Sequence, residues 1–202
     1  MKLRGLDHVS VTVADLDRSL SFYRDLLGLR VREAGEEEGG QMATIVGFPG
    51  VRFRYADVEL GGGQILELLQ YLEPAGTPIA QRTCDPGSGH IAFVVADIDQ
   101  TYAELVDAGV TVRSAPVTIE GPHDSGPVRV IHSMSEAAMS TEGPAVPQKA
   151  GAIGVTEVTE AVEEDAITIE VTDYWAGVKV FYAVDPDGVT LEFVQRPEGS
   201  DG

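Results

Sequence analysis

The sequence predicts an α+β protein built from two βαβββ modules, and two observations carry this prediction. The first is an internal repeat: residues 7–28 read DHVSVTVADLDRSLSFYRDLLG and residues 89–109 read GHIAFVVADIDQTYAELVDAG. The second is that further strand-like runs follow each copy. Self-similarity of this kind indicates a duplicated supersecondary unit. We therefore expect modules at residues 1–72 and 89–197, joined by a linker at 73–88 that is rich in Pro and Gly.

Each copy begins with a strand and continues as a helix. From His8 to Val13 polar and apolar residues alternate, which is typical of a half-buried strand. Asp15 then stands where a helix N-cap is needed, apolar residues recur at helical spacing, and Gly28 supplies the C-terminal stop. The second copy repeats this order, with Asp97 as the cap and a closing glycine.

Shorter strand-like runs complete each module. In the first module we expect these strands at residues 29–32, 43–46, 52–60 and 64–71. In the second module we expect them at residues 110–113, 178–184 and 189–194. The sequence Asp-Pro-Asp-Gly at 185–188 lies between two alternating runs, which is a strong signal for a hairpin turn.

The second module also contains an insertion of about forty residues, at about 129–176, rich in Ala, Gly, Thr and Glu. We interpret this insertion as a surface elaboration, with a lid or a dimer contact as the alternative. Within it, residues 166–171 alternate like a strand. The tail at 198–202 is expected to be disordered.

The composition excludes several classes of partner. With 14 Lys and Arg against 33 Asp and Glu, the net charge is -19, which disfavours nucleic acid and anionic membrane surfaces. No apolar run approaches the roughly 18 residues of a spanning helix, and we expect no export signal. The single cysteine, Cys84, fits a reducing compartment, so a cytoplasmic location is expected. We interpret most of the acidity as surface background.

Four residues form a candidate metal site. Each half offers a histidine at the start of its first strand, His8 or His90, and a glutamate in its last strand, Glu67 or Glu192. Glu67 stands in the apolar run ILELL, where an ionised carboxylate needs a positive partner. One divalent ion of Zn, Ni, Co, Mn or Fe suits two imidazoles and two carboxylates. Two duplicated halves could pair about a pseudo-twofold axis and bring the four side chains into one cleft.

The same segments identify a family. LDHVSVTVADLDRSLSFYRDLLGLRV, GGGQILELLQYLEP, GHIAFVVADID and DPDGVTLEFVQ resemble the vicinal oxygen chelate superfamily. This superfamily includes glyoxalase I, methylmalonyl-CoA epimerase, extradiol dioxygenases, and fosfomycin and bleomycin resistance proteins. The resemblance covers almost the whole chain outside the insertion. It implies a U-shaped open mixed sheet around one metal ion, and family ligands at His8, Glu67, His90 and Glu192.

The resemblance implies a metal-dependent lyase or isomerase closest to glyoxalase I and methylmalonyl-CoA epimerase. Such an enzyme abstracts a proton next to a carbonyl of a small chelated substrate, through an enolate or enediolate, with Glu67 or Glu192 as the base. The alternative is an Fe(II) extradiol-type dioxygenase that uses His8, His90 and Glu192. A second alternative is a non-catalytic resistance protein with an aromatic-lined pocket, for which Trp175, Phe48, Phe53 and Phe181 are the candidates.

Substrate contacts are less constrained by the sequence. Arg52 and Arg54 lie two residues apart on one expected strand, hence on one face, where they could grip a carboxylate or phosphate or simply face solvent. Tyr55 and Trp175 complete the candidate substrate-binding set. We expect two further histidines, His123 and His132, to be surface loop residues. Open sheet edges favour association as a homodimer.

Overall fold

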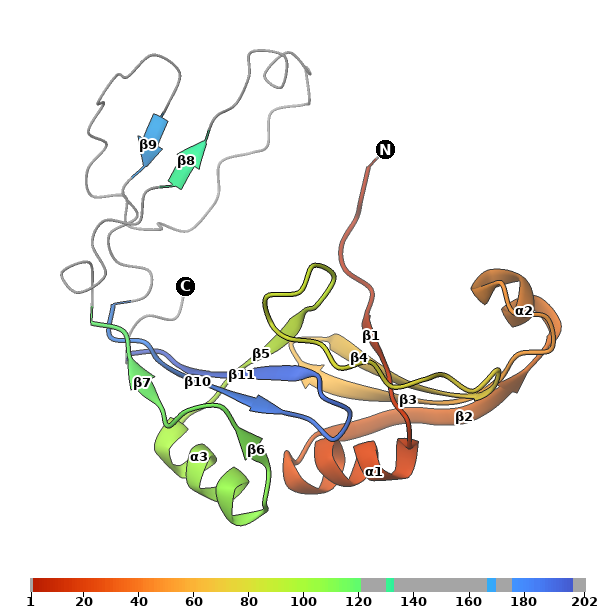
Figure 1. Cartoon of the computed structure of the whole chain (residues 1–202), viewed down its shortest axis with the longest axis horizontal. Coiled ribbons are helices and arrows are strands. Elements are labelled where there is room, and N and C mark those ends of the chain that lie inside the picture. The colour runs from red at the N-terminus through yellow and green to blue at the C-terminus, as the bar shows by residue number, and fades with distance from the viewer. Residues whose placement is uncertain (1, 121–129, 133–166, 170–175, 198–202) are drawn as a thin grey trace. The chain divides into compact units, whose positions relative to one another are not determined.

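A computed structural model describes residues 2–120, 130–132, 167–169 and 176–197 (Figure 1). The chain forms two compact units. The first comprises Met1–Ala92, Ala103–Arg113 and Tyr182–Glu192, and the second comprises Phe93–Tyr102, Ser114–Phe181 and Phe193–Gly202. The domain boundaries expected from the sequence stay predictions.

The first half of the chain forms a four-stranded mixed sheet, here called sheet A. Its strands are β1 (Val9–Thr12), β2 (Arg30–Glu38), β3 (Arg52–Gly61) and β4 (Gln64–Glu73), in the order β1-β4-β3-β2. Strand β1 runs parallel to β4, whereas β4 with β3 and β3 with β2 are antiparallel. The buried core residues of β3 and β4 include Ala56, Val58, Leu66 and Leu68.

The helix predicted after β1 is present and begins at the predicted cap. Asp15 Oδ1 accepts hydrogen bonds from two backbone N–H groups of the first turn, at 3.0 and 3.1 Å. Helix α1 (Leu16–Leu20) passes directly into a π-helical segment, η1 (Ser21–Leu26). Tyr23 is fully buried, and Gly28 follows with a φ of 72°. The predicted cap and stop signals are thus confirmed.

The strand predicted at residues 43–46 is wrong, because these residues belong to helix α2 (Gly40–Val46). Short apolar runs with β-branched residues fit a strand or a helix turn equally well, and periodicity does not separate the two. Here the glycines on either side of residues 40–46 favour the helix over a strand. Gly39 and Gly47 both adopt positive φ, 57° and 76°, and Gly47 ends the helix in the left-handed conformation.

The second half repeats the strand order of the first in a sheet here called sheet B. Its strands are β5 (His90–Val94), β6 (Thr111–Val112), β10 (Lys179–Val184) and β11 (Thr190–Gln195), in the order β5-β11-β10-β6, and β7 (Val117–Thr118) pairs with β10. When β7, β8 and β9 are left out of the count, both sheets have the order first, fourth, third, second strand of their half (Figure 1). The predicted α+β class with open mixed sheets is confirmed.

Helix α3 (Ile98–Asp107) follows β5, and the Asp97 carboxylate accepts a backbone hydrogen bond from its first turn at 2.9 Å. Aromatic rings fill the core of the second unit. Phe193 stacks on Phe181, with ring centroids 5.1 Å apart, and Tyr102 meets Phe181 edge-on at 5.5 Å. Such contacts supply much of the apolar burial in a small core.

Two short strands lie within the predicted insertion. Strand β8 (Val130–His132) pairs antiparallel with β9 (Ile167–Ile169), so the middle of the run predicted at 166–171 is a strand. His132 therefore lies in a strand rather than in the expected loop, because it follows the β-branched residues Val130 and Ile131, which favour strands. The rest of the insertion, His123, Trp175 and the tail at 198–202 lie outside the described residues. None of the described helices is long and apolar enough to span a membrane.

Candidate metal centre

Sheet A brings His8 and Glu67 together. His8 immediately precedes β1, and the parallel register of β1 with β4 places Ser10 opposite Glu67. Because alternate residues of a strand share a face, His8 and Ser10 lie on the face that carries Glu67. His8 Nε2 is 3.6 Å from Glu67 Oε2, and the Glu67 side chain is 25% exposed. The two donor atoms are therefore close enough to contact one metal ion.

Asp7 supports the His8 ring from the other side. The Asp7 carboxylate lies 2.8 Å from His8 Nδ1, and this hydrogen bond raises the pKa of His8, with the negative charge of Glu67 acting in the same direction. A histidine that donates Nδ1–H to a carboxylate keeps the Nε2 lone pair free for a metal ion. Asp7 is not among the residues predicted from the sequence, although its position directly before a candidate ligand is a signal.

Sheet B brings His90 and Glu192 together in the same way. His90 begins β5, Glu192 lies in the neighbouring β11, and His90 Nε2 is 3.1 Å from Glu192 Oε2. The Glu192 side chain is only 10% exposed. The Tyr182 ring lies 5.7 Å from the imidazole of His90, and burial together with the charge of Glu192 raises the pKa of Tyr182.

Each pair has the geometry of two neighbouring ligands of one metal ion. Donors at about 2.1 Å from an ion and 3.1 or 3.6 Å apart subtend about 95° or about 118° at that ion, close to octahedral and tetrahedral angles. The chemistry of the donors, one imidazole and one carboxylate in each pair, also suits a divalent ion. Among the described residues, however, no group of three or more His, Cys, Asp or Glu side chains forms a metal cluster. The residues thus form two half-sites, and their joining around one ion stays a prediction.

The predicted substrate contacts are engaged within the chain itself. Both Arg54 Nη atoms contact the carboxylate of Asp17 in α1, at 2.9 and 3.0 Å, so Arg54 lies on the helix-covered face of sheet A. Arg52 lies 3.2 Å from Glu36. Substrate binding by Arg52 or Arg54 stays a prediction.

Aromatic residues proposed for a binding pocket have several environments. Phe53 and Phe181 belong to the buried core, whereas Phe48 is half exposed. Tyr55, in the predicted substrate-binding set, donates its hydroxyl to Glu33 at 3.1 Å. Its role toward a substrate stays a prediction.

The predicted hairpin turn between β10 and β11 has a second role. Asp185 is 5% exposed; its Oδ1 accepts from the backbone N–H groups of Asp187 and Val189 at 2.9 and 2.8 Å, and its Oδ2 accepts from the hydroxyl of Tyr23 at 2.9 Å. Burial raises the pKa of Asp185. Asp187 receives Arg18 Nη2 at 2.6 Å and a backbone N–H at 3.0 Å. The turn therefore anchors the β1–α1 segment in the first unit.

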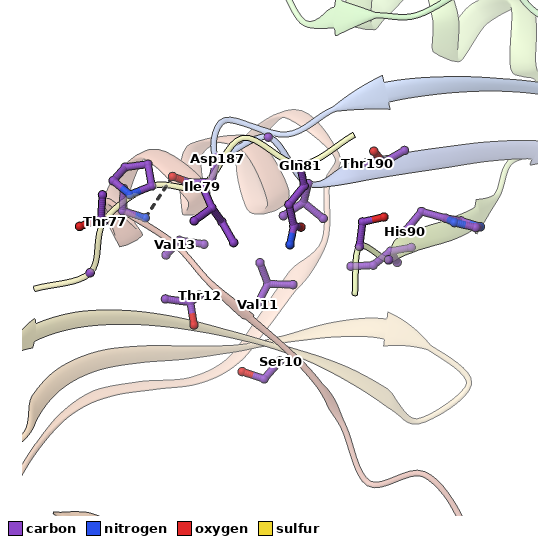
Figure 2. Close-up of a pocket in the computed structure, with 18 of the residues that line it drawn as sticks. Ser10, Val11, Thr12, Val13, Thr77, Ile79, Gln81, His90, Asp187 and Thr190 are labelled. Atoms are coloured by element: carbon purple, nitrogen blue, oxygen red, sulfur yellow. Dashed lines mark hydrogen bonds between the residues drawn. The ribbon is translucent and has the colours of Figure 1, made fainter. Parts of the chain in front are cut away.

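A cavity of about 560 Å³ lies in the first unit (Figure 2). Its walls are β1, the linker segment at 75–82, the start of β5 and the turn before β11. Val11 extends from β1 toward Gln81 of the linker, while His90 lies at one end. His8, Glu67 and Glu192 do not line it. The cavity has the size of a small-molecule site, but only one of the four predicted ligands reaches it.

Relatives by sequence and by structure agree with this architecture. The chain is 34% identical to 2-epi-5-epi-valiolone epimerase from Actinomyces over 58% of this chain and 67% of that protein. It is 29% identical to mouse mitochondrial methylmalonyl-CoA epimerase over 64% and 72%. A glyoxalase family protein from Bacillus cereus superposes with a TM-score of 0.61 at 17% identity, covering 96% of this chain and 95% of that one, which shows a shared fold.

Residues 5–123, more than half of the chain, match the family model described as the Glyoxalase/Bleomycin resistance protein/Dioxygenase superfamily. This superfamily includes metal-dependent epimerases, glyoxalases and dioxygenases that act on small molecules. The repeated strand order and the matched residues lead to one conclusion: the chain belongs to the Glyoxalase/Bleomycin resistance protein/Dioxygenase superfamily.

Proposed function

We propose that this protein is a metal-dependent lyase or isomerase of the glyoxalase type that abstracts a proton next to the carbonyl of a small substrate. The observation that carries the proposal is the recurrence of one His–Glu pair at equivalent places in sheets A and B. Two of the relatives found by sequence are named epimerases, enzymes that invert a stereocentre. This supports the isomerase branch over ring cleavage.

The proposed ligands are His8, Glu67, His90 and Glu192, which supply two neutral imidazoles and two carboxylates. A divalent ion held there would supply a Lewis acid that stabilises negative charge on the substrate's carbonyl oxygen. The protein's own task is then to position the substrate and to remove and return one proton.

The different environments of the two glutamates support different proposed roles for them. Glu192 is the more buried carboxylate and lies closer to its imidazole, which suits a fixed ligand. Glu67 is more exposed and 3.6 Å from His8, so its carboxylate has more freedom to reach a substrate proton. We therefore take Glu67 as the base, whose Oε accepts the proton from the carbon next to the carbonyl.

Metal content tests whether the two half-sites act together. The purified chain, stripped with a chelator and reconstituted separately with Zn, Ni, Co, Mn and Fe(II), is expected to bind about one ion per chain, because four ligands complete one shell. His8→Ala and His90→Ala should each abolish this binding. Two ions per chain, each sensitive to only one of the two variants, would contradict a shared centre, and no bound metal would reject the proposal.

Solvent deuterium exchange tests the chemistry. We expect the metal-loaded protein to catalyse exchange at the carbon next to the carbonyl in at least one α-hydroxy carbonyl compound, monitored by NMR. Glu67→Gln should lower this rate by about 10²-fold or more while the metal remains bound. Glu59→Gln, a carboxylate paired with Arg30 on the neighbouring strand, is the matched control. Oxygen consumption with catechols, retained in Glu67→Gln, would instead identify a three-ligand dioxygenase.

A further inference from the structure

The two sheets differ in the residues that flank their glutamates. In sheet A, Asp57 of β3 is the cross-strand partner of Glu67. Arg32 of β2 reaches the same Asp57, with Nη2 2.5 Å from its carboxylate. The row that crosses sheet A through Glu67 and Asp57 therefore ends in an ion pair, and the charge of Arg32 is neutralised within the chain.

The corresponding row of sheet B ends in a different pair. Tyr182 of β10 lies beside His90 and Glu192, as the ring distance of 5.7 Å and the influence of Glu192 on its pKa both indicate. Arg113, directly after β6, donates its backbone N–H to Tyr182 O at 2.8 Å, so it is the next residue across the sheet. An uncharged phenol thus takes the place of Asp57, and Arg113 corresponds to Arg32 in the sequence repeat, four residues after Gly109 as Arg32 is four residues after Gly28.

This exchange leaves the charge of Arg113 without an acidic partner. Its Nη2 is 3.5 Å from the hydroxyl of Thr190, a weak and neutral contact. Among the described residues, no carboxylate lies within ion-pair distance of Arg113. Seven other arginines do contact a carboxylate: Arg18, Arg24, Arg30, Arg32, Arg52, Arg54 and Arg82. The net charge of the chain is -19, so a guanidinium without a carboxylate partner is unusual in this protein.

The guanidinium of Arg113 also lies on the face of sheet B that carries Glu192. Arg113 reaches Thr190, and Thr190 is two residues from Glu192 on β11, so their side chains share one face of the sheet. Residues two apart on a strand are separated by about 6.6 Å. An anionic group held by Arg113 would therefore lie a few bonds from a reacting carbon beside Glu192.

We propose that Arg113 is a specificity-determining residue that binds the carboxylate of a small carbonyl or hydroxy acid whose reacting end reaches the His90–Glu192 pair. This inference rests on the proposed function and names its substrate class. A carboxylate matches the planar fork of one guanidinium through two parallel hydrogen bonds. A phosphate dianion or a CoA group would call for more cations than the described part of this face supplies.

Matched acids and amides test the proposal on the full-length chain. The probes are 4-oxopentanoate and pyruvate, each paired with its neutral amide, and their dissociation constants are measured by NMR titration of zinc-loaded and zinc-free protein. We expect at least one acid to bind about tenfold or more tightly than its amide, because a charge-assisted hydrogen bond contributes about tenfold to hundredfold in affinity. Arg113→Gln should remove this preference and leave amide binding and zinc content unchanged.

Two further variants separate a charge contact from a structural effect. Arg113→Lys should recover part of the preference, since it keeps the charge and loses the fork. Arg30→Gln, which removes an arginine already paired with Glu59, should leave the preference intact. Equal binding of acid and amide by the wild-type protein, absence of binding by both acids, or a preference that survives in Arg113→Gln would overturn the proposal. If the protein binds no zinc but still prefers the acid over its amide in a way that depends on Arg113, the metal centre would be rejected and the role of Arg113 would stand.

Discussion

At the scale of single residues, the two candidate histidines occupy equivalent positions but have different neighbours. His8 is preceded by Asp7, whose carboxylate lies 2.8 Å from Nδ1, whereas His90 is preceded by Gly89. Outer carboxylates of this kind fix the orientation of a ligand imidazole and make it more basic. The first half-site is therefore the better prepared of the two for a metal ion.

We expect Asp7→Ala to weaken metal binding by about tenfold, at the lower end of the range for outer-sphere partners, since Asp7 is exposed to water. Competition with a fluorescent chelator measures the change. Asp25→Ala, which removes an exposed carboxylate paired with Arg24, is the control. Unchanged affinity in Asp7→Ala would mean that the hydrogen bond to His8 contributes nothing to the metal site.

The sequence was most informative where a residue occurs twice. His8 and His90, or Glu67 and Glu192, each stand out because duplication repeats them at the same place in a module. Arginine is also repeated, as Arg32 and Arg113, but this repeat does not reveal the role of Arg113, which depends on which residue lies beside it in the sheet. Only the register, which places Tyr182 where sheet A has Asp57, shows that its charge is unpaired.

At the scale of elements, strands with clear alternation and turns with Pro and Gly could be predicted, whereas partners distant in the sequence could not. The turn at 185–188 was expected from its residues alone. Its contact with Tyr23 joins positions 162 residues apart, and no local pattern encodes it. Local patterns can also fail. Helix α2 has only seven residues, which is too short for periodicity to distinguish a helix from a strand.

Tyr23→Phe should destabilise the protein by about 1–3 kcal/mol at pH 7, because it leaves a buried carboxylate with one donor fewer. The hydroxyl of Tyr23 stabilises the ionised form of Asp185, which opposes the rise in pKa caused by burial. The loss should therefore shrink as the pH falls through the raised pKa of Asp185 and the carboxyl becomes neutral. Urea denaturation at pH 7 and at lower pH measures both values.

The variant Tyr55→Phe removes a hydroxyl that is bound to Glu33 on a partly exposed residue, and it serves as the control. It should leave the free energy of unfolding nearly unchanged, as is usual for surface positions. An equal loss for Tyr23→Phe at both pH values would show that the ionisation of Asp185 plays no part.

At the scale of the whole molecule, the sequence predicted the α+β class with open mixed sheets, whereas the order of the strands within each sheet comes from the structure. The predicted joining of the two half-sites around one ion depends on how distant segments pack rather than on any pattern within one module, and it stays a prediction. Each sheet supplies one imidazole and one carboxylate, and one pair alone leaves a divalent ion with too few protein ligands.

The net charge of -19 gives this metal-binding hypothesis a kinetic consequence for the entire molecule. A strongly negative protein attracts divalent cations over long distances and repels anions, and salt screens both effects. Raising the ionic strength from about 0.01 M to about 0.15 M shortens the Debye length from about 30 Å to about 8 Å.

We therefore expect the association rate constant for Co²⁺, measured by stopped-flow absorbance, to fall several-fold, while the dissociation rate constant changes little. Binding of the neutral amide 4-oxopentanamide is the control and should not respond to salt. An association rate constant for Co²⁺ that is equally insensitive would show that the surface carboxylates, although numerous, do not steer cations to the site.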